Sequence, residues 1–412
     1  MTIHVPAPDS SGTVELQSYI DGAHDGDTLL LAEGVYAADP TAFIDSLCGN
    51  CEEHRTPVEA TVGFIVRGKG IVIIGRSPSE TILETNAGYG IFFDRSRGSV
   101  LAAVTVTGGR RDPDGNATDA AVVARMSRVT VTGCEIIGNT SRIDTVVVGI
   151  GGVFGREGAD LYIYDNRILD TGWDGVALYR GATAVIADNE ISRGRGAGIG
   201  ITWDAVATVT GNRVSHFWKG IGTFGDSRAV VRGNAVCDNL GWGIIATGTS
   251  ELDATGNVVN HNGNCGLAVW SETCRARFTN NIVTKNGWRK EWVCPCVGVW
   301  MNGKNKQAEF SYNDIWGNEA GNYQDLPDLT GRDGNVSIDP EFPSNSNFEL
   351  PAGSPLVDAG NPLITDPDGT RSDIGIAKSR YPLLTPVRVR LYRKGPAPSP
   401  DTGPRMRGKK SE

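Results

Sequence analysis

Apolar and polar residues alternate in short stretches along most of the chain, and Gly or Asn separates one stretch from the next. Residues 198–202 (Gly-Ile-Gly-Ile-Thr) and 205–210 (Ala-Val-Ala-Thr-Val-Thr) show the pattern. Alternation with a period of two is typical of β-strands, because successive side chains of a strand point to opposite faces. The stretches are too short for helical repeats. The pattern therefore predicts a chain built almost entirely from short strands.

The strand pattern recurs at a nearly constant period, and an asparagine marks each unit. Successive marker asparagines lie 22 to 24 residues apart, at Asn166, Asn189, Asn212, Asn234, Asn257 and Asn281. A unit of this size fits one turn of a parallel β-helix, in which each coil pairs with the next and buries its inward residues in a continuous core. Gly and Asn would occupy corners that need a left-handed backbone. We expect the asparagines to stack as a structural ladder that satisfies backbone groups in the turns.

Both ends of the repeat region carry segments similar to those of a known superfamily. Residues 13–36 contain an amphipathic stretch, then Gly-Asp-Thr and Gly-Val-Tyr, and residues 348–360 read Phe-Glu-Leu-Pro-Ala-Gly-Ser-Pro-Leu-Val-Asp-Ala-Gly. With the repeat, they resemble the right-handed parallel β-helix proteins of the pectate-lyase-like superfamily over roughly residues 10–375. The resemblance implies an all-β, single-stranded, right-handed parallel β-helix of about ten coils with a short N-terminal capping helix. This fold serves lyases, hydrolases, epimerases, adhesins and the NosD-like copper-delivery proteins, so it leaves the function open.

The resemblance and the composition divide the chain into four parts. Residues 1–36 would form an N-terminal cap and residues 37–320 the β-helix body, with a cysteine-containing insertion at 37–62. Residues 321–375 are rich in Asp, Pro and Gly and would form a C-terminal capping segment. Residues 376–412 are basic and Pro-rich, which is typical of a disordered tail.

Composition narrows the partners of this chain. Its 412 residues carry 39 Lys and Arg against 48 Asp and Glu, and this net charge of −9 argues against a general nucleic-acid binder. No apolar run reaches the roughly 18 residues that a membrane-spanning helix needs. The first residues lack the basic and apolar regions of a signal peptide. The location therefore stays open: secreted or periplasmic if a signal peptide has been removed, and otherwise cytoplasmic.

The chain has eight cysteines, at positions 48, 51, 134, 237, 265, 274, 294 and 296. The first two could form a local disulfide, or bind zinc together with His54. A zinc site would need further ligands, and the Cys-Pro-Cys at 294–296 should lie many coils away. We expect Cys294 or Cys296 to pair instead with a cysteine of the neighbouring coil, at 265 or 274, and the cysteines at 134 and 237 to stay unpaired.

The alternation also predicts which side chains point out of the β-helix. After each leading Gly, the first and third residues of the strand should point inward and the second and fourth outward. The outward column then mixes arginines, acids and aromatics from Phe92 to Trp300, and in the coil that starts at Ala120 it contains Val122 and Ala124. A second row follows the marker asparagines by four residues: Asp170, Arg193, His216, Asp238, His261 and Lys285. The two rows should form the floor and wall of one groove, in which aromatic residues suit the apolar faces of sugars.

The leading hypothesis is β-elimination or C5 epimerisation on an acidic polysaccharide. Both reactions need a cation beside the uronate carboxylate and a base that removes the C5 proton. We predict His216 or Lys219 as the base and His261 or a nearby arginine as the proton donor. The carboxylate would bind to Arg156, Arg180, Arg193 or Arg195. Further predicted substrate contacts are Glu157, Asp174, Tyr179, Trp203, Trp218, Phe224, Trp242 and Trp270.

A calcium ion could take the place of the arginine, held by Asp204, Asp226 and Asp238, and no other cofactor is expected. Two other functions remain open. A glycoside hydrolase needs two carboxylates across the bond, and Asp204 and Asp226 stand one coil apart in the outward column. A non-catalytic carbohydrate-binding or scaffold protein would need only the aromatics.

Two family motifs are absent or altered. The chain lacks the Asn-Thr-Asp segment of polygalacturonase-type hydrolases, and residues 112–115 read Asp-Pro-Asp-Gly where alginate epimerases carry Asp-Pro-His-Asp. Both departures favour a lyase over a polygalacturonase-type hydrolase or an alginate epimerase. The expected partner is a polysaccharide or oligosaccharide in every case, and the protein could be a monomer or a homotrimer.

Overall fold

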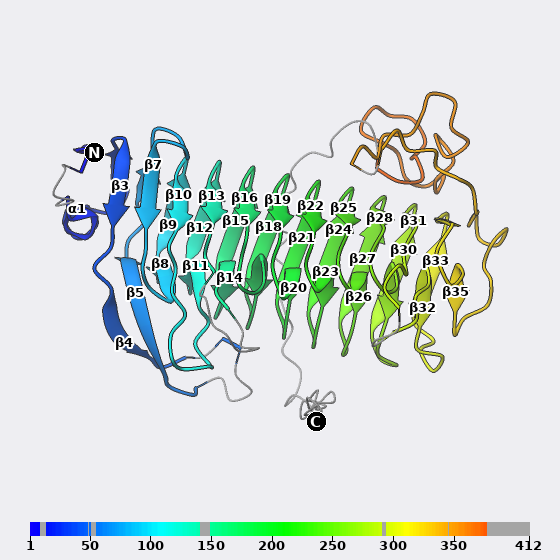
Figure 1. Cartoon of the computed structure of the whole chain (residues 1–412), viewed down its shortest axis with the longest axis horizontal. Coiled ribbons are helices and arrows are strands. Elements are labelled where there is room, and N and C mark those ends of the chain that lie inside the picture. Colours follow the sequence, from blue (N-terminus) through cyan, green and yellow to red (C-terminus); the bar gives the residue numbers. More distant parts are fainter. Residues whose placement is uncertain are drawn as a thin grey trace.

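A computed structural model describes residues 1–8, 14–47, 49–50, 55–140, 149–290, 294–344 and 346–376. In this part of the chain the strands stack into an elongated β-helix whose coils follow one another along a single axis (Figure 1). Three sheets run along its sides, with 12, 11 and 12 strands. The described residues contain one α-helix, α1 (Leu16–Gly22), at the N-terminal end. The predicted all-β parallel β-helix with a short N-terminal helix is confirmed.

From β2 onward, each coil contributes one strand to each of the three sheets, and β4 is an extra strand that pairs antiparallel with β5. Sheet A consists of β1 (Thr2–Val5), β2 (Thr28–Leu31), β6 (Val72–Ile74), β9 (Arg97–Ala102), β12 (Arg128–Thr132), β15 (Asp160–Tyr164), β18 (Thr183–Ala187), β21 (Val206–Thr210), β24 (Arg228–Arg232), β27 (Glu251–Thr255), β30 (Arg275–Thr279) and β33 (Ala308–Ser311). Sheet B consists of β3 (Gly34–Ala37), β7 (Thr81–Glu84), β10 (Thr105–Thr107), β13 (Glu135–Ile137), β16 (Arg167–Leu169), β19 (Glu190–Ser192), β22 (Arg213–Ser215), β25 (Ala235–Cys237), β28 (Val258–Asn260), β31 (Ile282–Thr284) and β34 (Asp314–Trp316). Sheet C consists of β4 (Thr41–Asp45), β5 (Val58–Arg67), β8 (Tyr89–Asp94), β11 (Ala120–Arg125), β14 (Gly151–Arg156), β17 (Val176–Leu178), β20 (Ala197–Ile201), β23 (Lys219–Thr223), β26 (Trp242–Ala246), β29 (Leu267–Val269), β32 (Val299–Met301) and β35 (Tyr323–Gln324).

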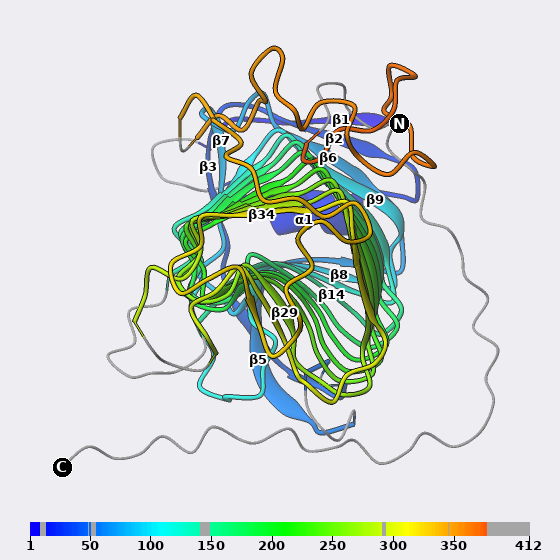
Figure 2. The same ribbon diagram turned by 90° about the vertical axis from the view of Figure 1, so that its right-hand side faces the viewer.

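The three sheets enclose a continuous apolar core. Figure 2 shows the stacked coils viewed along the axis of the β-helix. Equivalent side chains stack from coil to coil: Ile199, Ile221 and Ile244 are registered partners, and all three are fully buried. At the N-terminal end, α1 packs Leu16 and Ile20 onto the core. Burying one such side chain stabilises the fold by about 1.5–3 kcal/mol, so the stack of coils supplies most of the driving force.

The marker asparagines form the expected ladder at the corner between sheets A and B. The Asn189 side-chain oxygen accepts hydrogen bonds of 3.0 Å from both the backbone and the side-chain N–H of Asn166. Asn189 in turn donates to the Ile163 carbonyl oxygen at 2.9 Å. A second ladder, which the sequence analysis did not predict, follows the corner between sheets B and C through Asn239, Asn262, Asn286 and Asn318. Both ladders satisfy buried backbone groups in the turns and so hold each coil in register.

The face prediction is wrong for one strand, β11. The side chains of Val122 and Ala124 lie in the central core, and that of Val123 lies outside it. Val122 is the registered partner of Ile91 and Val153, which both point inward. The prediction started one residue too early because no glycine marks the beginning of this strand.

The chain leaves the coil pattern after β34. Residues 346–376 turn back along the outside of sheet B, where Phe348 and Leu356 pack with Val258 and Ile282 (Figure 1). This part of the predicted capping segment therefore covers a side of the β-helix.

Several predictions fall on residues outside the described part of the chain. They concern Cys48, Cys51, His54 and all of the basic tail except Ile376. The described residues contain no helix long and apolar enough to cross a bilayer, since α1 has only seven residues.

Candidate functional site

On the outer face of sheet C, one column of registered residues has unusually small side chains in its middle. Phe154 of β14 is followed by Ala177, Gly200 and Gly222 of β17, β20 and β23, and then by Ile245 of β26. Three small residues in succession leave space above the backbone for side chains that reach in from the turns. We call the outer face of β17, β20, β23 and β26 the outer strip.

Asp174 precedes β17, and its carboxylate bends over the neighbouring coil. Oδ1 accepts a hydrogen bond of 2.5 Å from the Ala197 backbone N–H. Oδ2 lies 3.5 Å from the place where a Cβ on Gly200 would stand. Burial raises the pKa of this carboxyl group to about 6, although the Ala197 N–H and the charge of Lys219 act in the opposite direction. Asp174 can therefore hold or release a proton near neutral pH.

Lys219 opens β23 and extends along the outer face of that strand. Its ammonium nitrogen lies 4.6 Å from the centre of the Phe224 ring, and that ring in turn covers Gly222. Burial lowers the pKa of the Lys219 ammonium group, and the nearby charge of Asp174 opposes the shift. Because β20 and β23 are neighbours in sheet C, the Asp174 carboxylate and the Lys219 ammonium group lie over adjacent strands.

Aromatic rings and an arginine border the outer strip on its N-terminal side. Tyr179 is buried and packs edge-on against Phe154, with ring centres 5.7 Å apart. Burial and the charge of Asp174 raise the pKa of the Tyr179 hydroxyl well above its usual range, so it stays protonated. The guanidinium group of Arg180 stacks 4.2 Å above the Trp203 ring. A planar cation in this position can donate two parallel hydrogen bonds to a carboxylate.

Tryptophans continue the outer face of sheet C toward the C-terminal coils. Trp218, Trp242, Trp270 and Trp300 form a tryptophan row in which neighbouring rings meet edge to face, with centres 5.7, 5.7 and 5.2 Å apart. The Lys219 ammonium nitrogen lies 5.8 Å from the Trp242 ring. Trp242 is buried at 3 % exposure, so the half-buried rings of Trp218, Trp270 and Trp300 supply the apolar surface, which suits the apolar face of a sugar with an acidic substituent.

The second predicted row lies at the corner between sheets B and C. This corner row comprises Asp170, Arg193, His216, Asp238, His261 and Lys285, whose backbone φ angles all lie between 53° and 63°. Its members pair with one another: Arg193 donates to Asp170 at 2.6 and 2.8 Å, and His261 Nδ1 lies 2.8 Å from the Asp238 carboxylate. His216 is exposed, and so is Arg195 two residues beyond the row. The structure thus separates the predicted residues into a corner row and an outer strip.

The acids predicted to act as a hydrolase pair, or as calcium ligands, point apart. Asp204 accepts a hydrogen bond of 2.6 Å from the Gly181 N–H in the preceding coil. Asp226 instead accepts one from the Thr249 hydroxyl in the following coil. Among the described residues, no three His, Cys, Asp or Glu side chains cluster closely enough to hold a metal ion. The described side chains therefore do not fit a calcium ion.

Arg156 and Glu157 are predicted substrate contacts that the structure encloses. The Arg156 side chain is 0 % exposed, and its guanidinium group pairs with Asp45 and, at 2.7 Å, with Glu157. Asp45 also pairs with Arg125 at 2.5 Å. Asp45 ends β4, so the insertion covers the outer face of sheet C at these coils. The sequence did not indicate Asp45, because the repeat pattern does not show on which coil an insertion folds.

A buried pair of carboxyl groups fastens the same insertion from the other side. Asp112 accepts hydrogen bonds from the backbone N–H and the hydroxyl of Thr61, at 2.8 and 2.6 Å. Asp112 and Asp119 converge on Gly88, where any larger residue would collide with both carboxyl groups. Burial and the neighbouring Asp112 raise the pKa of Asp119 to about 8. The Asp-Pro-Asp-Gly segment singled out in the sequence therefore contributes its first residue to a buried carboxyl pair, whose Asp119 also lies 3.4 Å from the buried guanidinium group of Arg111.

A match to a known protein family agrees with this architecture. The family described as "Right handed beta helix region" matches residues 151–315. No curated protein matches the chain. The solved structure of pectate lyase Pel9A is similar at 14 % identity over 92 % of this chain and 96 % of its own, with a TM-score of 0.45.

Two epimerase structures show a similar degree of likeness. The periplasmic alginate epimerase AlgG shares 12 % identity over 80 % of this chain and 96 % of its own, with a TM-score of 0.45. The A-module of the Azotobacter vinelandii mannuronan C-5 epimerase AlgE6 shares 14 % identity over 79 % and 94 %, with a TM-score of 0.43. The family match over residues 151–315 and the three sheets of stacked parallel strands together show that the chain folds as a right-handed parallel β-helix.

Proposed function

We propose that the outer strip binds an acidic polysaccharide and that Lys219 and Asp174 catalyse its cleavage by β-elimination. The observation that carries the proposal is the placement of these two groups over adjacent strands of one face, each with a pKa moved toward neutrality by burial. Titratable groups whose surroundings shift their pKa values in this way are typical of acid–base sites.

The chemistry needs a base, a proton donor and a cation. Neutral Lys219 removes the C5 proton of a uronate residue, and Arg180 holds the carboxylate and stabilises the negative charge that develops there. Protonated Asp174 donates its proton to the glycosidic oxygen as the bond to C4 breaks. One product then carries a C4–C5 double bond and the other a hydroxyl group. Lys219 returns its proton to solvent, and Asp174 takes one up.

The surroundings of this pair favour a glycan over a small substrate. The tryptophan row and Phe224 offer apolar ring surfaces along several coils on one side of Lys219. The divergence of Asp204 and Asp226 counts against hydrolysis by that pair, because a hydrolase needs two carboxylates that face each other across the bond.

The test is to offer the protein a panel of uronic-acid polysaccharides and to follow absorbance near 235 nm, where the new double bond absorbs. We expect absorbance to rise with at least one substrate, and the Lys219→Met variant to lose this activity. The matched control is Lys285→Met, a lysine of the exposed corner row, which should retain it.

Three other outcomes would overturn the proposal and point to a different function. Deuterium incorporation at C5 in D2O without absorbance would indicate an epimerase. New reducing ends without absorbance would indicate a hydrolase. Binding without any of these changes would indicate a carbohydrate-binding protein.

A further inference from the structure

The insertion that follows β3 and contains β4 lies across the outer face of sheet C, next to the outer strip. The Phe43 ring packs against Tyr89 and Phe92, with ring centres 5.5 and 5.8 Å away. Beyond it, Asp45 pairs with Arg125 and Arg156. These contacts place the insertion over β8, β11 and β14, the three strands that precede the outer strip.

The contact is closest at β14. The Leu47 carbonyl oxygen accepts a hydrogen bond of 2.6 Å from Arg156. A Cβ placed on Gly49 would lie 2.6 Å from the Arg156 Cδ and 3.3 Å from a Glu157 carboxylate oxygen. No space for a sugar ring remains between this backbone and β14. The buried charges also resist separation, because each would lose its partner in a poorly solvated position.

The distance from the insertion to the proposed reaction centre is short. From β14 to the strands beneath the Asp174 and Lys219 head groups, β20 and β23, there are two to three strand spacings of about 4.8 Å, or roughly 10–14 Å. That span has room for a short oligosaccharide only. On the other side of Lys219 the tryptophan row continues to Trp300 in β32.

We propose that the insertion closes one end of the binding surface, so that the protein cleaves near a chain end and releases short oligosaccharides of uniform length. This inference rests on the proposed function. The end of the polysaccharide that is released lies between Gly49 and the reaction centre, and the remaining polysaccharide lies on the tryptophan row.

The size of the products tests the closed end with the wild-type protein. On a long polymer, we expect anion-exchange chromatography to show one short product class from the first turnovers. Viscosity should fall slowly while absorbance near 235 nm rises. A broad mixture of product lengths with an early loss of viscosity would overturn the closed end but leave the lyase in place. The absence of any absorbance change would instead remove the proposed function on which the inference rests.

Two buried cysteines lie close together beside the tryptophan row. Cys265 precedes β29, Cys294 lies in the insert between β31 and β32, and their sulfur atoms are 2.7 Å apart in a buried position. This distance is only about 0.7 Å longer than a disulfide bond. The other two predicted candidates point elsewhere: Cys296 contacts the Arg289 carbonyl oxygen at 2.8 Å, and Cys274 contacts the Ser271 carbonyl oxygen at 3.2 Å.

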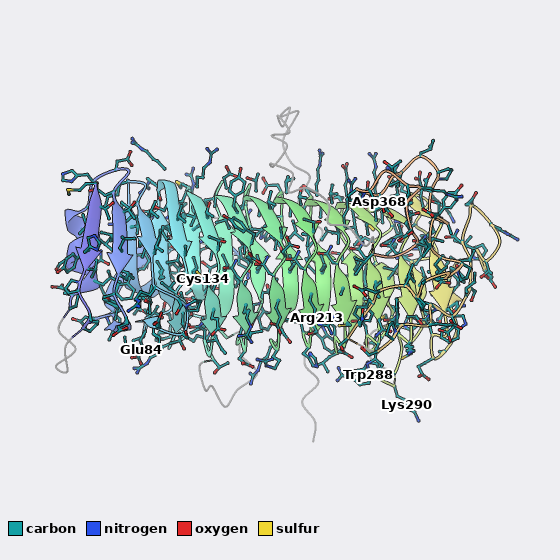
Figure 3. All side chains as sticks on the ribbon, turned by 90° about the horizontal axis from the view of Figure 1, so that it is seen from above. Glu84, Cys134, Arg213, Trp288, Lys290 and Asp368 are labelled. Carbon is teal, nitrogen blue, oxygen red and sulfur yellow. The ribbon has the colours of Figure 1, made fainter. Side chains whose placement is uncertain are left out.

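We infer that Cys265 and Cys294 form a disulfide. The two thiols lose two protons and two electrons to a disulfide oxidant such as oxidised glutathione, which is reduced to two thiols. The bond would fix an insert that carries two aromatic contacts: Arg289 lies 5.1 Å over the Trp218 ring, and Trp288 stacks on His261 at 5.6 Å. Figure 3 shows Trp288 projecting from one edge of the C-terminal coils.

Peptide mapping tests this assignment. After treatment with oxidised glutathione and alkylation without reductant, we expect a peptide pair linked through Cys265 and Cys294. Cys134, which lies in a distant coil (Figure 3), should be alkylated as a free thiol. Reductant should lower the melting temperature of the wild type but not that of the Cys265→Ser/Cys294→Ser double variant. Full alkylation of both cysteines after oxidant, or a link within Cys294-Pro-Cys296, would overturn the inference.

Discussion

Asp174→Asn should make the protein more stable at neutral pH while it removes the proposed proton donor. The folded protein raises the pKa of Asp174 from an ordinary 3.8 to about 6. At about 1.4 kcal/mol per pKa unit, ionisation of this group destabilises the folded state by about 3 kcal/mol relative to the unfolded state. Asparagine has nearly the same shape, and its oxygen can still accept the hydrogen bond from the Ala197 N–H.

The sign of the effect follows from proton linkage. Between pH 4 and pH 6 the folded state binds more protons at Asp174 than the unfolded state does. The free energy of unfolding of the wild type therefore falls as pH rises through this range. The Asp174→Asn variant has no carboxyl group at this position, so its free energy of unfolding does not fall in this way. Its advantage over the wild type should be near zero at pH 4 and should grow to about 3 kcal/mol at pH 8.

Urea unfolding at pH 4, 6 and 8, followed by tryptophan fluorescence, measures this advantage. The control is Asp170→Asn in the corner row. The ion pair with Arg193 lowers the pKa of Asp170, so removal of its charge should destabilise the protein as pH rises, which is the opposite sign. An Asp174→Asn advantage that does not change with pH, or a variant less stable than the wild type at pH 8, would refute the reasoning.

Three further predictions test other parts of the structure. Trp270→Ala should weaken binding of a uronic-acid oligosaccharide by about tenfold or more in calorimetry, because its half-buried ring lies in the middle of the tryptophan row. Asn234→Ala should lower the free energy of unfolding in urea by about 2–4 kcal/mol, since it leaves the Asn212 N–H and the Val209 carbonyl oxygen buried without their partner. Raising the pH above 8 should ionise Asp119 beside Asp112 and lower the protection factors for amide exchange in β5, taken relative to the intrinsic exchange rate at each pH; Asp119→Asn should remove this change in protection.

Each of these has a clear contrary result. Unchanged affinity in Trp270→Ala would show that the tryptophan row does not bind the glycan. A loss below about 1 kcal/mol in Asn234→Ala would show that water replaces the ladder bonds. Equal protection factors in β5 at pH 6 and pH 9 would show that the carboxyl pair does not hold the insertion.

Much of the fold could be predicted because each coil repeats the same physical constraints. The alternation in residues such as Ile199 and Ile201 fixes the inward face, and the asparagine period fixes the length of a coil. The prediction failed at Val122 and Ala124, where no glycine anchors the alternation. It also missed the second asparagine ladder, because Asn239 and its partners begin only in the later coils.

The site was harder to predict because it depends on segments outside the repeat. The sequence pattern placed Asp174, Tyr179 and Lys219 on the groove side but gave equal weight to the corner row. It could not show that Asp174 reaches over Gly200, since side-chain direction follows from the turn geometry. Nor could it show that the insertion carries Asp45 onto the coils that precede the outer strip. Charge and exposure distinguish these groups only once the three-dimensional positions are known.

The central claim is that the chemistry takes place at Lys219 on the outer strip. The most direct test compares the initial rates of absorbance increase near 235 nm for Lys219→Met and His216→Ala on the same uronic-acid polysaccharide. A general base contributes about 10²–10⁴-fold to the rate, so Lys219→Met should lose at least about a hundredfold while His216→Ala stays within a few-fold of the wild type. A large loss in His216→Ala together with an active Lys219→Met would place the base in the corner row and contradict the account.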